Sequence, residues 1–167
     1  MLELRELPDA HILKKFADRY PDADIDQILQ FLTFLHVATD LSNGLDRYLA
    51  SHDLLQGRWW VLILLMREDD HCASPSKLAE KAGVSRATMT GLIDSLQRDK
   101  LVSRSTSNKD RRQTLVRLTR AGQKKLDDVM PDYYRRLNQL MSALSKQEGD
   151  MLMSILSKLR QQSAVFD

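Results

Sequence analysis

The segment 76–122 constrains the fold more than any other part of this chain, because its turn residues set the order of four short elements. A first helix ends before Gly83, and Ser85 is a typical N-cap for a second helix that follows at once. Two short strands are expected next, at 101–105 and 114–118, and the second alternates apolar with polar residues. Two helices joined by a tight turn and followed by a strand pair form a winged helix-turn-helix.

Basic side chains are concentrated in the same part of the chain. Between Ser76 and Lys125, thirteen lysines and arginines stand against four aspartates and glutamates, a net charge of +9. The whole chain carries only +2, so the remaining residues sum to −7. An ordinary solvated face rich in lysine would explain the charge alone. Because the charge coincides with the helix-turn-helix pattern, we expect a polyanionic partner instead, double-stranded DNA.

The composition fits a chain that is mainly α-helical. Its 167 residues are 43% hydrophobic and only 6% aromatic, which suits one ordinary domain or two small domains packed together. The longest apolar run, 59–66, is too short to cross a bilayer, and the first residues lack the pattern of a signal peptide. The single cysteine, Cys72, excludes an internal disulfide. We therefore expect a cytoplasmic protein without a membrane partner.

Apolar residues at three- and four-residue spacings predict helices on both sides of the winged segment. The expected ranges are 11–19, a long helix from Asp24 or Asp26 to about residue 51, 56–68, 120–144 and 145–162. Helix 56–68 is apolar nearly all round and should therefore be central. Pro131 should kink or restart helix 120–144.

The apolar stripes of the flanking helices exceed what one small winged domain can cover. We therefore expect a homodimer formed through both chain ends. Completion of a monomeric core is the alternative. On this basis we divide the chain into residues 1–55 and 120–167, for dimerisation, and 56–119, for the winged helix-turn-helix.

A more specific pattern lies in DRRQTLVRLTRAG, residues 110–122. Its spacing is D-x-R, three residues, an aliphatic residue, one residue, L-T, two residues and G, formed by Asp110, Arg112, Val116, Leu118, Thr119 and Gly122. This pattern resembles the wing signature of the MarR family of bacterial transcription regulators, and the spacing within 78–101 is similar to that family as well. The N-terminal arm and the segment from Pro131 to Ser145 are similar to its EmrR/MprA-like branch of multidrug-efflux repressors.

The resemblance implies a mainly helical dimer of winged lobes. Each lobe would place its second helix, the recognition helix, in a DNA major groove and its wing in the neighbouring minor groove. Two symmetric lobes would require a pseudo-palindromic operator. In many members of the family, a small aromatic or phenolic ligand releases the DNA.

The candidate DNA contacts lie in the first turns of the recognition helix and in the wing. They are Ser85, Arg86, Thr88, Met89 and Thr90 in the helix, and Lys109, Arg111 and Arg112 in the wing. The guanidinium group of Arg86 can bind a guanine edge, and the Met89 side chain can contact a thymine methyl group. Arg112 can enter a narrow minor groove. Family analogy assigns Asp110 to bracing Arg112. A surface helix with ordinary caps is the alternative for the threonines.

The resemblance also implies a ligand pocket between the dimerisation helices and the winged lobe. The candidate lining residues are His36, Arg58, Trp59, Ile63 and Met66, with Tyr133 or Tyr134 closing the site. Aromatic walls with one or two polar groups suit a flat hydrophobic acid or cation. Core packing is the alternative: we favour it for Trp60, Ile63 and Met66, and hold the two explanations equal for Arg58 and Trp59.

Nothing in the sequence indicates catalysis, a cofactor or a metal, since nucleophile elbows and phosphate loops are absent. Cys72 has no resolving partner, so we expect a passive thiol rather than a redox sensor. Zinc binding by His71 and Cys72 with His52 and Asp53 lacks the usual ligand spacing. The leading hypothesis is therefore a DNA-binding transcription regulator, expected to be a repressor. The alternative is a winged-helix module that binds proteins and lacks specific DNA binding.

Overall fold

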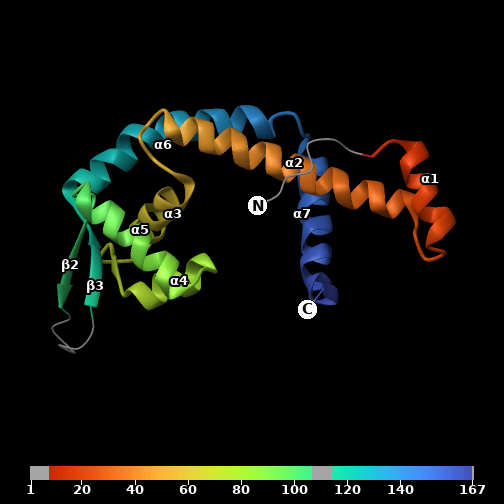
Figure 1. Ribbon diagram of the computed structural model, residues 1–167. Coiled ribbons are helices and arrows are strands. Elements are labelled where there is room, and N and C mark those ends of the chain that lie inside the picture. The colour runs from red at the N-terminus through yellow and green to blue at the C-terminus, as the bar shows by residue number, and fades with distance from the viewer. Residues whose placement is uncertain (1–7, 107–113, 167) are drawn as a thin grey trace.

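The computed structural model describes residues 8–106 and 114–166 and shows an elongated molecule with a winged lobe at one end (Figure 1). The helices are α1 (Ala10–Arg19), α2 (Ile25–Ala50), α3 (Gln56–Met66), α4 (Pro75–Ala82), α5 (Arg86–Arg98), α6 (Arg120–Met141), α7 (Lys146–Gln161) and the 3-10 helix η1 (Ser163–Phe166). The strands are β1 (Cys72–Ala73), β2 (Val102–Thr106) and β3 (Thr114–Leu118). The predicted mainly helical fold, with a winged helix-turn-helix between terminal helices, is confirmed.

Helix α3 forms the centre of the winged lobe, as its nearly uniform apolar sequence predicts. Trp59, Leu62 and Leu65 of this helix are fully buried. They belong to one core that also contains Ile93 and Leu96 of α5. Burying a side chain of this size contributes roughly 1.5–3 kcal/mol. The recognition helix therefore rests on a firmly packed support.

A three-stranded antiparallel sheet, in the order β1-β3-β2, closes the lobe. Strands β2 and β3 pair from Val102 opposite Leu118 to Thr106 opposite Thr114. The predicted alternation of β3 is confirmed, because Val116 and Leu118 are buried whereas the residue between them is exposed. Strand β1 was not expected from the sequence, because it is too short to show a periodic pattern.

Side-chain caps begin the helices where the sequence indicates. In each of four caps a side-chain oxygen accepts a hydrogen bond from the backbone N–H three residues later, and the capping residues are Asp24, Ser74, Ser85 and Thr119. Asp24, and not Asp26, therefore caps α2. Ser145 and Glu148 form a capping box at the start of α7. Helix α4 ends at Gly83, whose φ of 64° lies in the left-handed region.

The junction between β3 and α6 is unusually close. Thr119 Oγ1 donates to the carbonyl oxygen of Lys100 at 2.7 Å and accepts from the N–H of Gly122 at 3.0 Å. A Cβ atom at Gly122 would approach the Leu101 carbonyl oxygen to 2.1 Å. The L-T-x-x-G part of the sequence pattern thus reflects a helix cap and a backbone contact that only glycine permits.

Helix α6 runs through Pro131 as a single helix, so the expected restart at this residue does not occur. A proline removes one hydrogen bond of a helix. Pro131 is exposed, and water can satisfy a freed carbonyl group on that side. Figure 1 shows α6 arched above the winged lobe, and the helix ends at Met141 rather than near Leu144.

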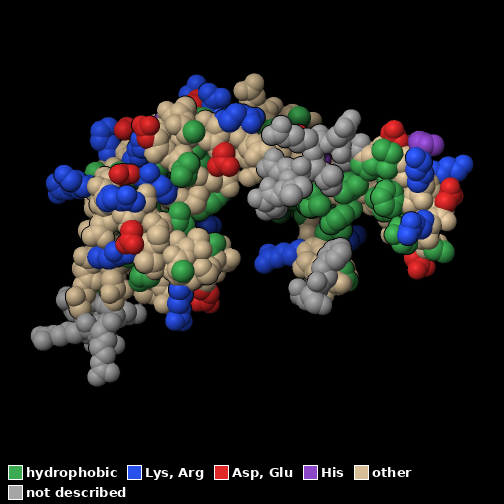
Figure 2. Space-filling view, in the orientation of Figure 1, with side chains coloured by type: hydrophobic (Ala, Val, Ile, Leu, Met, Phe, Trp, Pro, Cys, Tyr) green, Lys and Arg blue, Asp and Glu red, His purple; other side chains and the backbone are tan. Residues whose placement is uncertain are grey.

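Apolar side chains remain exposed along the helices of both chain ends. Figure 2 shows hydrophobic patches over the end of the molecule that carries α1. The exposed apolar side chains of these helices include Ile12 and Phe16 of α1, Phe31, Phe34 and Leu35 of α2, Leu137 and Leu140 of α6, and Met151, Ile155 and Leu159 of α7. Helix α7, which the structure describes throughout, contains no buried residue. The apolar stripes therefore do not complete a core within one chain.

Across the described residues, no helix combines the length and the apolar character needed to cross a membrane.

Candidate nucleic-acid interface

The recognition helix α5 presents a polar first turn to solvent. Ser85 Oγ accepts a 3.1 Å hydrogen bond from the Thr88 N–H and lies 2.8 Å from the Thr88 hydroxyl oxygen. The Thr90 hydroxyl donates to the Arg86 carbonyl oxygen at 2.9 Å. All four residues are exposed. The three hydroxyl groups of this turn are therefore held by local hydrogen bonds, and the Arg86 side chain is exposed beside them in the sequence.

Met89 does not belong to this exposed surface, so the prediction that it contacts DNA was wrong. Its side chain is fully buried, together with those of Ile93 and Leu96. Spacings of four and three residues put these three side chains on one face of the helix. Ala87, two residues before Met89, is exposed instead. Met89 therefore anchors the first turns of the helix in the core rather than facing a partner.

Two small residues on the exposed face of α5 were given no binding role from the sequence. Ala87 and Gly91 are both exposed and lie one helical turn apart. Among the described residues, a Cβ atom added at Gly91 would meet nothing within 4 Å apart from its chain neighbours and the backbone of its own helix. Small side chains let a helix backbone approach a partner closely. The four-residue spacing of these two residues, beside Arg86 and Thr90, was the available sequence signal.

Arg104 of β2 reaches the exposed face of α5, which the sequence analysis also missed. Its Nη1 atom lies 2.6 Å from a carboxylate oxygen of Asp94 and donates to Oε1 of Gln97 at 3.1 Å. This guanidinium group joins the recognition helix to the strand that leads into the wing. No spacing rule predicts such a contact, because it depends on how the strand packs against the helix.

The tip of the wing lies outside the described residues. The four residues predicted to act there, Lys109, Asp110, Arg111 and Arg112, fall within 107–113. The paired strands on either side, ending at Thr106 opposite Thr114, are described and form the base of the wing. The roles of Lys109, Asp110, Arg111 and Arg112 at the tip therefore stay predictions.

Several basic residues of the lobe have partners within the lobe. The carboxylate of Glu68 contacts the ammonium groups of Lys77, at 2.6 Å, and Lys81. Hydrogen bonds from these two lysines hold the pKa of Glu68 below its ordinary value. Arg117 donates to the carbonyl oxygen of Asp70 at 2.7 Å. Part of the net positive charge therefore anchors α4 and β3 rather than facing a partner.

A cleft of about 720 Å³ lies between α2, α3 and α6. Its walls include Leu45 and Tyr48 of α2, Trp60 of α3, and Tyr133 and Arg136 of α6. Trp60 is 41% exposed. The cleft thus combines aromatic walls with the carboxylate of Asp40 and the guanidinium group of Arg136, whose Nε pairs with Asp132 at 2.7 Å.

The predicted ligand residues do not form this cleft, apart from Tyr133. The candidates that do not line it are His36, Arg58, Trp59, Ile63, Met66 and Tyr134. Trp59 is fully buried and packs edge-on against Tyr133, with ring centres 5.5 Å apart. Ile63 and Met66 pack against the core, in agreement with the favoured explanation for these two residues. Nε2 of His36 lies 3.5 Å from a carboxylate oxygen of Asp40 on the same helix. Trp59, for which the two explanations were equal, therefore fills the core, whereas Trp60, which was expected in the core, lines the cleft.

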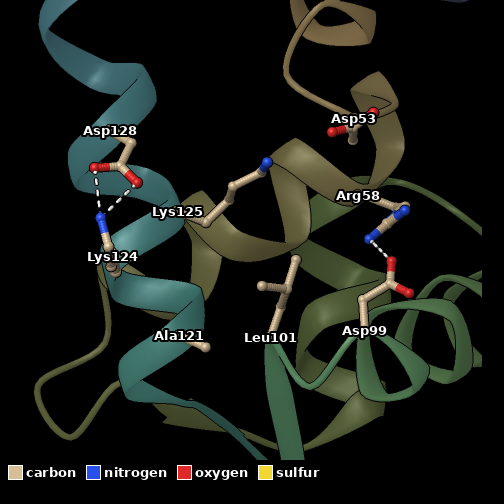
Figure 3. A pocket seen from close by; sticks show the side chains of 8 residues that line it. All are labelled: Asp53, Arg58, Asp99, Leu101, Ala121, Lys124, Lys125 and Asp128. Atoms are coloured by element: carbon tan, nitrogen blue, oxygen red, sulfur yellow. Dashed lines mark hydrogen bonds and ion pairs between the residues drawn. The ribbon is translucent and has the colours of Figure 1, made fainter.

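Arg58 lies in a second, smaller cleft of about 350 Å³ between α3, the end of α5 and the start of α6 (Figure 3). Its guanidinium group forms an ion pair with Asp99, the C-cap residue of α5. On the opposite wall Lys124 pairs with Asp128 at 2.9 Å. The lining charges of this cleft are therefore largely balanced in pairs, and Arg58 serves to hold the end of the recognition helix against α3.

Cys72 is a partly buried free thiol on β1. Within the parts of the chain that the structure describes, no three histidine, cysteine or acidic side chains gather as a metal site would require.

Comparison with known proteins identifies relatives of this chain. The model of the MarR family matches residues 56–114. Over 165 residues, the chain is 31% identical to the HTH-type transcriptional repressor YetL of Bacillus subtilis, a match that covers 99% of each protein. Over 152 residues, it is 32% identical to the transcriptional repressor MprA of Escherichia coli, covering 91% of this chain and 86% of that protein.

Solved structures share the fold. The MarR family regulator Sco3205 of Streptomyces coelicolor, solved in complex with DNA, matches with a TM-score of 0.76 and 20% identity over 83% of this chain and 88% of that one. The S. aureus MepR–DNA complex matches with a TM-score of 0.71 and 21% identity, over 78% and 95% of the two chains. At these identities the similarity concerns the fold.

Proposed function

Because this chain belongs to the MarR family, whose members are transcription regulators and not enzymes, we propose that it is a dimeric repressor that binds a specific DNA sequence in the cytoplasm. The observation that carries the proposal is the exposed, polar first turn of α5, held on the core of a basic lobe. Two relatives are named as repressors, and two proteins of the same fold were solved with DNA.

The first turn of α5 supplies the base contacts in this proposal. Arg86 binds a guanine edge, while the hydroxyl groups of Ser85, Thr88 and Thr90 bind phosphates or bases. In the wing, Arg112 enters the minor groove and Asp110 braces it.

The flanking cations Lys109 and Arg111 bind phosphates in the same proposal. Asp110→Ala should weaken binding although it removes a negative charge. Tighter binding by that variant would remove the brace from the proposal.

A second copy of the chain covers the exposed apolar faces of α1, α2, α6 and α7. A helix such as α7 that buries none of its apolar stripe needs a partner surface to be stable in water. A two-fold dimer would present two recognition helices to half-sites one or more helical turns apart. We therefore propose that residues 1–55 and 120–167 form the dimerisation region, that 56–119 form the DNA-binding domain, and that the operator is pseudo-palindromic.

The larger cleft is the proposed effector site. Trp60, Tyr48 and Tyr133 offer aromatic walls, and Arg136 offers a partner for an acidic group. A small aromatic or phenolic acid bound there would contact α2 and α6 as well as α3. It would favour a spacing of the two lobes that no longer matches successive grooves, and the DNA would be released.

Selection from a random double-stranded DNA library, followed by titration of the selected site at several salt concentrations, tests the proposed DNA binding. Arg86→Ala should weaken binding by about 1–3 kcal/mol and relax the preference at one base pair, and Arg112→Ala should cost a similar amount. Arg98→Ala removes the same charge from the last residue of α5 and should weaken all sequences alike. If no sequence is enriched and all DNA binds weakly, the chain is a protein-binding winged helix instead.

Tryptophan fluorescence tests the effector site with a series of substituted benzoates and phenols. Trp60 is exposed in the cleft and Trp59 is buried, so bound ligand should quench wild type and leave Trp60→Phe nearly unchanged. The same ligands should lower DNA affinity. Equal quenching of both proteins, or quenching without DNA release, would place the effector elsewhere.

A further inference from the structure

Strand β2 is linked to the recognition helix through a single arginine side chain. Val102 of this strand is buried, and Arg104 follows two residues later on the same side of the sheet. Val102 fills the core, whereas Arg104 passes the edge of the core and contacts the outer face of α5. Its guanidinium group holds Asp94 and Gln97, at 2.6 Å and 3.1 Å.

The two partners of Arg104 lie three residues apart and so share one face of α5. Asp94 is the only acidic residue within Arg86–Arg98, all of which the structure describes. A carboxylate without a partner on this face would repel DNA phosphates. The contact with Arg104 neutralises that charge and gives Asp94 a reason to be present on a helix that faces a polyanion.

Arg104 also stands directly before the wing. Strand β2 ends at Thr106, which pairs with Thr114 at the start of β3. The direction of these strands sets the direction in which the wing leaves the lobe. Arg104 lies two residues before Thr106, the end of β2. Its contact with α5 therefore controls the direction of the strands close to the point where the wing leaves the lobe.

We infer that Arg104 is a positioning residue that fixes the wing relative to the recognition helix, so that both elements enter neighbouring grooves as one body. Arg104 acts through Asp94 and Gln97 and does not itself bind a phosphate. This inference rests on the proposed DNA binding. An exposed ion pair adds little to the free energy of unfolding. The effect of the Arg104–Asp94 pair should therefore appear in DNA binding and in the mobility of β2 and β3.

The decisive variant is Asp94→Asn, because the two explanations predict opposite signs. If Arg104 positions the wing, Asp94→Asn lowers affinity for the selected operator by about two- to fivefold. If Asp94 is only an acid near DNA, its removal raises affinity. Asp128→Asn is the matched control, since it removes a charge and breaks an exposed ion pair with Lys124 on α6 without touching α5 or β2.

The salt dependence of binding separates positioning from a direct phosphate contact. For a positioning residue, Arg104→Gln keeps the slope of log affinity against log salt concentration. Loss of a phosphate contact lowers that slope by about 1. The double variant Asp94→Asn/Arg104→Gln should lose no more affinity than the weaker-binding single variant, because both act through one contact.

Amide hydrogen exchange of the full chain supplies a readout without DNA. Asp94→Asn should speed exchange in 102–106 and 114–118, with an almost unchanged melting temperature, whereas Asp128→Asn should not. This result stands even if the wild type prefers no DNA sequence, so failure of the proposed function remains distinguishable. Unchanged exchange together with tighter DNA binding by Asp94→Asn, or a lowered salt slope for Arg104→Gln, would overturn the inference.

Discussion

Tyr48 of α2 donates a hydrogen bond of 2.9 Å to the backbone carbonyl oxygen of Val129 on α6. The guanidinium carbon of Arg136 lies 5.1 Å from the centre of the Tyr48 ring, and the ring of His52 packs edge-on at 4.9 Å. Partial burial raises the pKa of the Tyr48 hydroxyl, which therefore stays protonated as a donor at neutral pH. Tyr48 thus joins two long helices at the wall of the larger cleft.

Replacement of this hydroxyl should destabilise the chain. Tyr48→Phe removes one partly buried hydrogen bond and should lower the free energy of unfolding by about 0.5–1.5 kcal/mol. Urea denaturation measures the loss. Tyr134→Phe is the control, because Tyr134 is exposed and no hydrogen bond of its hydroxyl occurs within the described residues. Equal losses in the two variants would mean that the contact with Val129 contributes nothing specific.

Gly91→Ala should change stability and DNA binding in opposite directions. In the free chain the new methyl group meets no atom within 4 Å, and alanine favours a helix interior by roughly 0.5–1 kcal/mol. The same methyl group would obstruct a close approach of α5 to DNA. Denaturation and operator titration of one preparation measure both effects.

Gly149→Ala makes the same change in α7, where within one chain no described side chain lies within 4 Å of the added Cβ atom, and is the reference for a helical glycine outside α5. If Gly91→Ala binds DNA as tightly as the wild type, α5 does not approach DNA along this face.

Local signals in the sequence were sufficient for the helix caps, the turn and the order of elements in the lobe. Ser85, Thr119 and the Ser145–Glu148 pair each act within three residues of chain, so their effects do not depend on distant packing. The L-T-x-x-G pattern was also visible, although its cause, the approach of Gly122 to the Leu101 carbonyl, required the structure.

The orientation of helix faces was harder to predict. Helix α3 is apolar nearly all round, so its sequence has no polar side to distinguish Trp59 from Trp60. In α5 Met89 was expected on the exposed face, and its burial depends on a space in the core of the lobe that the sequence does not show. The contact of Arg104 with Asp94 was beyond prediction because it depends on how β2 packs against α5.

The contribution of Glu68 to stability should depend on pH. Lys77 and Lys81 lower its folded pKa below the ordinary value of about 4.3, so the ionised carboxylate favours the folded state. That stabilisation is fully present above the ordinary pKa and is lost as the pH falls through the lowered one. Glu68→Gln should therefore melt at a lower temperature than the wild type at neutral pH, with a difference that shrinks below about pH 4.3.

Glu80→Gln, at an exposed position of α4, is the control for this pH series and should leave the melting temperature nearly unchanged at neutral pH. A Glu68→Gln deficit that is the same at pH 7 and pH 3 would assign the loss to packing rather than to charge.

Gly122→Ala should lower the free energy of unfolding more than an alanine at any other helical glycine that the structure describes. Its Cβ atom would lie 2.1 Å from the Leu101 carbonyl oxygen and 2.7 Å from Leu118 Cδ1, so the start of α6 must move away from the lobe. Overpacking of this kind costs about 1–3 kcal/mol or more, and the movement would also disturb the cap at Thr119. Gly44→Ala makes the same chemical change where the nearest atom, Nη2 of Arg47, is 3.9 Å away, and should stabilise α2 by roughly 0.5–1 kcal/mol. Denaturation curves of the two variants should therefore shift in opposite directions. A shift of the same sign in both would show that the segment at Leu101 yields easily, and that the glycine of the L-T-x-x-G pattern is kept for a reason other than this contact.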